Sequence, residues 1–435
     1  MRRLLLLLTV ALLLHVPSGL FAFDWGGSID TSAGLSLADG DADESFSVRT
    51  ALFASNRFSP FFRVEGQVSY TYSLDRDYLV DVDFLFGSLR QPFVSEGRTP
   101  LLLDVQAGRF RFADMSGRVL STRADGLTIG LETPEADVLI GAAYTGLVLR
   151  PNSTVKMSES DVADEADDDL FAPPRLVVMT MVTFNELVGR QSAMVSTIFQ
   201  NDLRSDSELD ELNGVGRVNT GYVGLGLTGP ITSTLFYNTF YYYGFGRALA
   251  EVFPGVYEYR PISGHLAGYG VQYFMPQRSF SVIETNLLFA SGDANQQQFF
   301  EGGVGDGSTM FLPISSSPFG LIFSPRASNL LVADVGYSVR PFAAQPSALS
   351  NLQTQLKYFA FFRPTTGVIS EQGANPDGNY LGSEVDFSIN FRPFSDLGLG
   401  LALGAFFPSA GEDKALNADA WKTEFLARFD LSFRY

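Results

Sequence analysis

The sequence predicts an all-β protein, a transmembrane antiparallel β-barrel of about 18 strands with short periplasmic turns and long extracellular loops. Three observations predict this fold. The chain begins with an export signal, it has no later apolar stretch long enough for a membrane-spanning helix, and it alternates between apolar and polar residues from end to end. With 42 Gly, 21 Pro and 13% aromatic residues, the composition suits many strands joined by turns.

The first 22 residues are typical of a cleaved secretory signal peptide. Arg2 and Arg3 supply positive charge, residues 4–14 form an apolar run of about 11 residues, and Ala22 is small enough for cleavage. The apolar run is too short to span a bilayer, which needs about 20 residues. We therefore expect residues 1–22 to be removed and residues 23–435 to form one outer-membrane β-barrel domain, without a globular plug before it.

The C-terminal segment has the clearest local pattern. From Trp421 to Tyr435, the odd-numbered positions are mostly apolar or aromatic and the even-numbered positions mostly charged or polar. This period of two predicts a strand with lipid on one side and water on the other. A terminal aromatic residue also resembles the usual ending of outer-membrane barrels, so we expect the barrel assembly machinery to bind the strand that ends at Tyr435.

The same alternation recurs in about 18 segments of roughly ten residues each. These predicted strands are centred near residues 31, 50, 67, 84, 106, 128, 142, 180, 196, 222, 237, 269, 285, 334, 357, 386, 402 and 428. In the segment near residue 84, Asp81 and Asp83 are expected to face the lumen. The residues expected on its lipid side are Val80, Val82, Phe84 and Phe86.

The connections between these segments alternate in length. Long or acidic connections, such as 148–174, 245–262 and 292–328, alternate with short ones, such as 133–136 and 276–278. Outer-membrane barrels have long outer loops and short periplasmic turns. An even number of strands also places both chain ends in the periplasm.

The formal charge of −18 lies mainly in the loops, because basic and acidic residues are nearly balanced on the predicted inner faces. Charged rows in a water-filled barrel can select solutes by charge and size. They can also be a structural network in which neighbouring strands pair their charges. The candidates for the pore lining are Arg109, Arg111, Lys357, Arg363, Glu384, Asp386, Arg392, Lys422, Glu424 and Arg428.

The acidic segment 159–169 has two interpretations. Its carboxylates could hold a divalent cation, with Asp164, Asp167, Asp168 and Asp169 as ligands, because hard cations prefer oxygen. Alternatively, the segment is a solvated loop whose charge opposes aggregation. We favour the loop, because the glycine-punctuated spacing of a calcium site is missing. The chain has no Cys, so thiolate metal sites are excluded, and we expect neither a metal nor a cofactor.

A family resemblance adds to this reasoning. The stretch 380–408, YLGSEVDFSINFRPFSDLGLGLALGAFFP, resembles the closing part of the alginate-export-type outer-membrane porins. Ala107-Gly108-Arg109 and Asp125-Gly126 also lie where that family carries a Gly-Arg-Gln step followed by Asp-Gly, with Phe110 here in place of the Gln. The resemblance implies an 18-stranded barrel that acts as a passive conduit for a polymer or for small polar solutes.

We therefore expect a porin of the bacterial outer membrane that passes polar solutes or oligosaccharide-like molecules. Its partners would be outer-membrane lipid and the solute or polysaccharide cargo. The alternative is a surface-exposed barrel that acts as an adhesin or interaction protein through its long acidic loops. An enzyme is not expected, because no motif marks a nucleophile for His265. Nucleic acid is not expected as a partner either, because the chain has no basic patch.

Overall fold

The structure is a computed structural model, and it describes residues 22–76, 78–94, 100–158, 161, 170–205, 209, 216–296, 299 and 307–435. Residues 1–21, most of the predicted signal peptide, lie outside the described residues. None of the helices in the described part of the chain is long and apolar enough to cross a membrane.

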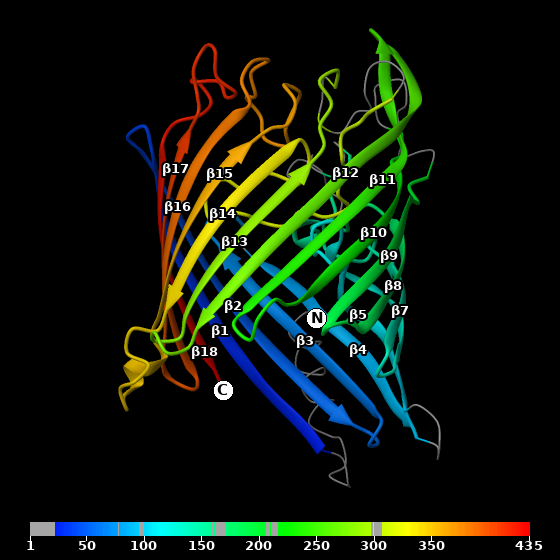
Figure 1. Cartoon of the computed structure of the whole chain (residues 1–435), viewed down its shortest axis with the longest axis vertical. Helices are drawn as coiled ribbons and strands as arrows, with labels where there is room; N and C mark the ends of the chain where they lie inside the picture. Colours follow the sequence, from blue (N-terminus) through cyan, green and yellow to red (C-terminus); the bar gives the residue numbers. More distant parts are fainter. Residues whose placement is uncertain are drawn as a thin grey trace, which may run out of the picture.

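The described chain forms one closed antiparallel sheet of 18 strands, in which each strand pairs with the next and β1 pairs with β18 (Figure 1). The first half comprises β1 (Ala22–Ala38), β2 (Asp41–Arg57), β3 (Phe62–Ser73), β4 (Leu79–Phe93), β5 (Leu101–Ala113), β6 (Ser121–Glu132), β7 (Ala136–Tyr144), β8 (Arg175–Val188) and β9 (Gln191–Asp202). The second half comprises β10 (Asn219–Pro230), β11 (Leu235–Phe253), β12 (Val256–Met275), β13 (Ser281–Ala290), β14 (Leu330–Val339), β15 (Gln353–Phe362), β16 (Tyr380–Phe394), β17 (Leu397–Pro408) and β18 (Glu424–Arg434). Two short 3-10 helices, η1 (Arg150–Asn152) and η4 (Ala348–Asn351), lie in connections.

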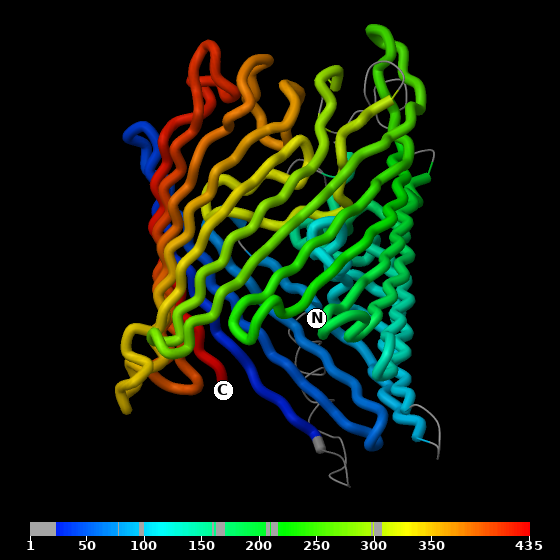
Figure 2. Tube along the Cα trace, viewed as in Figure 1, coloured from blue at the N-terminus to red at the C-terminus, as the bar shows by residue number. Residues whose placement is uncertain are grey.

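The predicted fold class is confirmed, and every predicted strand centre falls within an observed strand. Closure of the ring brings the start of β1 beside the end of β18, with Ser28 paired to Arg434. The beginning of β1 and the C-terminus therefore lie at the end of the barrel that carries the short turns (Figure 2).

The predicted connection at 245–262 is wrong, because most of it is strand. β11 and β12 continue far beyond the wall as a hairpin that turns between Phe253 and Val256 (Figure 1). Gly255 permits this tight turn with a positive φ of 75°. The aromatic residues that follow the expected strand end, such as Phe245, continue the pairing rather than a loop.

The predicted orientation of Phe84 and Phe86 is also wrong. The pairing of β3 with β4 shifts by one residue, since Gln67 lies opposite Phe84 while Val68 lies opposite Val82. One extra residue reverses the two faces of a strand from that point on. Leu85 is therefore exposed on the outside, and Phe86 turns inward against Phe110, with ring centroids 5.8 Å apart.

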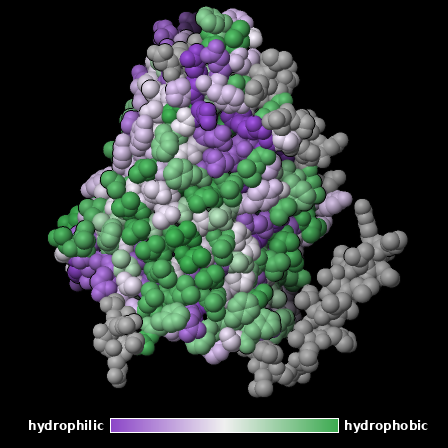
Figure 3. Space-filling model, turned by 90° about the vertical axis from the view of Figure 1, so that its right-hand side faces the viewer, coloured by the Kyte–Doolittle hydropathy of each residue, from purple (hydrophilic) through white to green (hydrophobic). Residues whose placement is uncertain are grey.

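The outside of the wall is apolar, as the alternation predicted. Exposed outward side chains include Leu225, Ile283, Leu287, Val335, Phe429 and Phe433. Figure 3 shows hydrophobic residues over the middle and lower part of one face and hydrophilic residues toward its upper end. Trp421 is an exception to the predicted pattern, because β18 begins only at Glu424. Its indole donates a hydrogen bond to the carbonyl of Gln372 and packs edge-on against Phe323.

Candidate functional site: a lumen narrowed from within

The far end of the β5–β6 hairpin leaves the wall. β4 pairs with β5 only from Leu85 and Arg109 onward, and β6 pairs with β7 only up to Asp125 and Tyr144. Residues 110–113 and 121–124 continue to pair with each other. Met115 at the tip lies against the inner face of β10, because a Cβ placed on Gly226 would be 2.9 Å from its sulfur. The hairpin end, residues 110–124, therefore crosses the lumen.

A second segment, residues 307–328, crosses the lumen above this hairpin, and we call it the strap (Figure 1, yellow). Near its start, Ser263 of β12 donates its N–H to the carbonyl of Ser308 at 2.8 Å. In its middle, Ile314 donates its N–H to the carbonyl of Val119 on the hairpin end at 2.9 Å. The strap thus connects the β12 side of the wall with the hairpin end.

The strap reaches the wall again at β16. The main-chain N–H groups of Ile322 and Phe323 each donate to the Glu384 carboxylate at 2.8 Å, and that of Leu321 donates to Asp386 at 3.2 Å. Glu384 is fully buried. Two carboxylates that the sequence suggested as pore lining therefore hold the strap in place through their oxygens.

Aromatic contacts reinforce both ends of the strap. Phe311 packs edge-on against Tyr222 of β10, with ring centroids 5.7 Å apart. Phe323 stacks on Phe406 of β17 at 4.5 Å with an interplanar angle of 7°. The strap also contains a buried base, Arg326, and burial lowers the pKa of its guanidinium to about 10. No local pattern in the sequence indicated the strap, because these contacts join residues that are far apart along the chain.

Charged side chains on the wall and the hairpin end pair in chains. In the longest described chain, acids and bases alternate through Asp30, Arg49, Asp83, Arg123, Asp81, Arg109 and Asp125. Arg49 of β2 lies 2.5 Å from Asp83, and Arg123 of the hairpin end lies 2.8 Å from that same carboxylate. We call this chain of ion pairs the charge ladder. It connects the hairpin end to β4, across the gap left where the hairpin end bends away from the wall. Arg49 and Arg123 were not among the predicted candidates. Arg123 stands two residues before Asp125, and this spacing was visible in the sequence.

The structure separates the other predicted candidates. Arg109 pairs with Asp125 at 2.8 Å where the hairpin leaves the wall, and exposed Arg111 donates to the Ser121 hydroxyl on the hairpin. Lys357 pairs with Glu284 at 2.8 Å across β13 to β15. These three side chains take part in local networks. Such networks are the second interpretation that the sequence allowed for the charges on the inner wall.

Arg428 and Arg392 lie on the more open side of the wall. Arg428 pairs with Asp430 on its own strand at 3.1 Å. Arg392 is exposed and lines a hollow of about 450 Å³ with residues of β1, β2, β16, β17 and β18. Among the described residues, no carboxylate pairs with Arg392. Its guanidinium is therefore available to water in the lumen.

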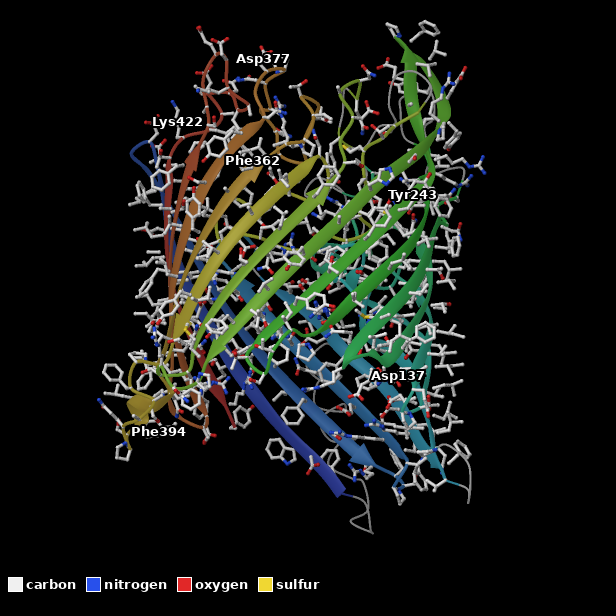
Figure 4. All side chains as sticks on the ribbon, in the orientation of Figure 1. Asp137, Tyr243, Phe362, Asp377, Phe394 and Lys422 are labelled. Atoms are coloured by element: carbon white, nitrogen blue, oxygen red, sulfur yellow. The ribbon has the colours of Figure 1, made fainter. Side chains whose placement is uncertain are left out.

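The last three candidates lie toward the end of the barrel that carries the long connections. Arg363 is 1% exposed, and its guanidinium donates to the carbonyls of Gly367, Asn375, Asp377 and Gly378. Burial lowers the pKa of this guanidinium. Lys422 pairs with Asp39 at 3.6 Å at the long-loop rim (Figure 4), and Glu424 accepts a hydrogen bond from Ser36. That these ten residues line a conduit stays a prediction.

The four candidate metal ligands, Asp164 and Asp167 to Asp169, lie outside the described residues. Among the residues that the structure does describe, no group of three or more His, Asp or Glu side chains could hold a metal ion. Asp161 of the same acidic segment is buried and pairs with Arg175 at 2.8 Å. His265 faces Tyr241, whose hydroxyl lies 2.7 Å from the Nδ1 atom.

Comparison with known proteins agrees with this architecture. No family model matches the chain, and no curated protein matches it in sequence. Among solved structures, Pseudomonas aeruginosa OpdL is 13% identical, with 95% of this chain and 99% of that chain covered and a TM-score of 0.58. P. aeruginosa OccK2 (OpdF) in complex with glucuronate is 11% identical, with 95% and 98% covered and a TM-score of 0.58. P. aeruginosa OccK5 (OpdH) is 12% identical, with 94% and 98% covered and a TM-score of 0.55. These neighbours are outer-membrane porins, and at such low identity the likeness establishes the 18-stranded barrel fold.

Proposed function

We propose that the protein is a porin that lets polar solutes diffuse passively across a bacterial outer membrane. The observation that carries this proposal is the two-sided wall, which is apolar on the outside and carries charge ladders on the inside. A closed barrel satisfies its backbone hydrogen bonds in lipid, and charged rows in a narrowed lumen select solutes. The strap and the hairpin end narrow the lumen with the chain's own connections, as a selective channel requires.

The cargo is proposed to be small, polar and hydroxylated. One solved neighbour, OccK2, is described in complex with glucuronate, a sugar acid. An oligosaccharide-like or polysaccharide cargo, which the resemblance to alginate-export-type porins implies, is the finer form of this proposal. The resembling stretch forms the hairpin of β16 and β17, which carries the Glu384 and Asp386 anchors of the strap.

Export and assembly are proposed from the two ends of the chain. Residues 1–22 would be removed as a signal peptide during export. The barrel assembly machinery would recognise β18. The residue after this strand, Tyr435, exchanges two main-chain hydrogen bonds of 3.1 Å with Gly27, where β18 and β1 close the ring. Outer-membrane lipid would then surround the apolar band. Neither an enzymatic reaction nor a nucleic-acid partner is part of this proposal.

Planar-bilayer recording of the purified, refolded protein tests the channel. Stepwise conductance is expected, and liposomes containing the protein should swell in glucuronate and in neutral monosaccharides. Heat-modifiable migration on a gel serves as the folding control. A correctly folded barrel that gives no conductance steps would reject the porin function.

A surface-contact function is the second candidate, favoured by the β11–β12 hairpin. This hairpin rises beyond the wall and ends at Phe253 and Val256, which are 71% and 47% exposed (Figure 1). Exposed apolar side chains at a protruding tip suit contact with another molecule. A folded but non-conducting barrel that loses cell attachment when residues 250–259 are removed would support this candidate over the channel.

A further inference from the structure

The two sides of the inner wall differ in what covers them. On the side of β9 to β17, inward residues near the strap are closed off, and Ile198, Tyr242, Leu330, Phe361 and Phe406 are each 0% exposed. On β18, no residue is buried. The inward positions of β1 from 28 to 38 are likewise only partly covered. At the level of the strap, the accessible inner wall therefore lies near the seam where β18 meets β1. A separate hollow of about 530 Å³ lies against β10–β13 and is lined by Asn238, Gln272 and Asn286.

Two apolar clusters explain the covered side. One joins the hairpin end and the first half of the strap to β8–β13, with Leu120, Phe311 and Ile314 each 0% exposed. The other joins the second half of the strap to β14–β17 through Phe323 and Leu416. Interiors packed in this way hold few voids as large as a water molecule. A hydrated solute therefore cannot pass through either cluster.

The seam side has polar walls and free space. The hollow of about 450 Å³ lies against β1, β2 and β16–β18, and its lining includes Asp30, Ser32, Ser47, Arg49, Asp430 and Ser432. Ser32 and Ser47 are direct partners in the pairing of β1 with β2. Arg49 on the same face is linked through Asp83 to Arg123 of the hairpin end. The hollow therefore begins beside the narrowed part of the lumen.

We propose that solutes cross this barrel along one side, between the inner faces of β18, β1 and β2 and the inward-folded hairpin end and strap. This inference rests on the proposed porin function and deepens it by assigning the path. Arg49, whose side chain is 36% exposed between Asp30 and Asp83, is then a charged group that each solute passes. At the level of the strap, the other side of the lumen is filled by the two apolar clusters.

The natural absence of Cys allows a direct test by single-cysteine labelling. Ser32→Cys and Ser47→Cys place thiols on the proposed path, and Ser196→Cys places one on the covered side, where Ser196 is 0% exposed. Each variant is recorded in a planar bilayer before and after a small, negatively charged methanethiosulfonate reagent is added. Mass spectrometry measures labelling, and heat-modifiable migration confirms that each barrel has folded.

The expected result is a stepwise loss of conductance for the Ser32 and Ser47 variants and no change for the Ser196 variant. Two results would overturn the assigned path while leaving the porin function intact: conductance that survives complete labelling at both 32 and 47, or a block through position 196. A folded wild-type protein without any conductance would instead remove the porin function and the path together. These outcomes separate the failure of the path from the failure of the channel.

Discussion

Glu384 of β16 and Phe323 of the strap are joined by a hydrogen bond of 2.8 Å from the main-chain N–H to the carboxylate. Ile322 donates to the other oxygen of the same carboxylate. The approach is close, because a Cβ on Gly320 would lie 2.5 Å from Glu384. One buried side chain thus fixes the far end of a segment that divides the lumen.

Replacing Glu384 with Ala is expected to release this end of the strap and raise single-channel conductance. The change removes both acceptors, and each buried N–H left without a partner costs about 1–3 kcal/mol. The 18 strands keep their own pairing, so heat-modifiable migration should be retained. Glu412→Gln, in the connection before β18, is the control and should conduct like the wild type. Unchanged conductance of a folded Glu384→Ala barrel would show that this carboxylate does not set the aperture.

The wall could be predicted from the sequence because its physics is local. Each strand exposes one face to hydrocarbon and one to the lumen, so apolar and polar residues alternate along every strand segment. That alternation is interrupted at Asp83, where one extra residue turns Phe84 and Phe86 inward, so the predicted orientation is wrong from there on. The predicted end of β11 is also too early, since β11 and β12 continue their pairing beyond the wall.

The narrowed lumen could not be predicted in the same way. The strap is held by contacts such as Tyr222 with Leu312 and Glu384 with Ile322, which join residues far apart in the sequence. Arg363 shows the same limit. Its charge suggested pore lining, but four carbonyl groups of a neighbouring loop enclose it. The alternation of residues predicts whether a side chain faces the lumen or the lipid. The conformation of the connections decides whether a lumen-facing side chain contacts water or protein.

Arg392→Glu is expected to shift the reversal potential in a salt gradient toward cation selectivity. Arg392 lines the hollow on the seam side, and no described carboxylate neutralises it. The variant reverses the charge of an exposed side chain on the inner wall. Arg278→Glu, an exposed residue in the turn after β12, carries the same change outside the wall. Its effect should be smaller, because charges farther away than about 8–10 Å are largely screened at physiological salt. Equal reversal potentials for the two variants would remove Arg392 from the lining.

Arg363→Ala is expected to loosen the loop between β15 and β16 without changing ion selectivity. The substitution leaves four carbonyl groups without their donor, and we expect a loss of stability of roughly 2–4 kcal/mol. Limited proteolysis of residues 364–379 and the midpoint of thermal unfolding in detergent measure this loss. A reversal potential that moved as far as that of Arg392→Glu, with the loop still protected, would contradict the structural role.

Gly264→Ala is expected to push the strap away from β12. A Cβ at Gly264 would lie 2.5 Å from the Cα of Phe311, and this neighbour is backbone, which cannot rotate away as a side chain can. Displacement of Phe311 would also break its edge-on contact with Tyr222 and expose Arg326, a buried residue of the strap itself. Trypsin should therefore cleave after Arg326 in the variant, and conductance should rise. Gly130→Ala on the inner face of β6 is the matched control, because its nearest neighbour would be 3.6 Å away. If Gly264→Ala resists trypsin as well as the control does, the strap tolerates the added methyl group and its close approach to β12 does not hold it in place.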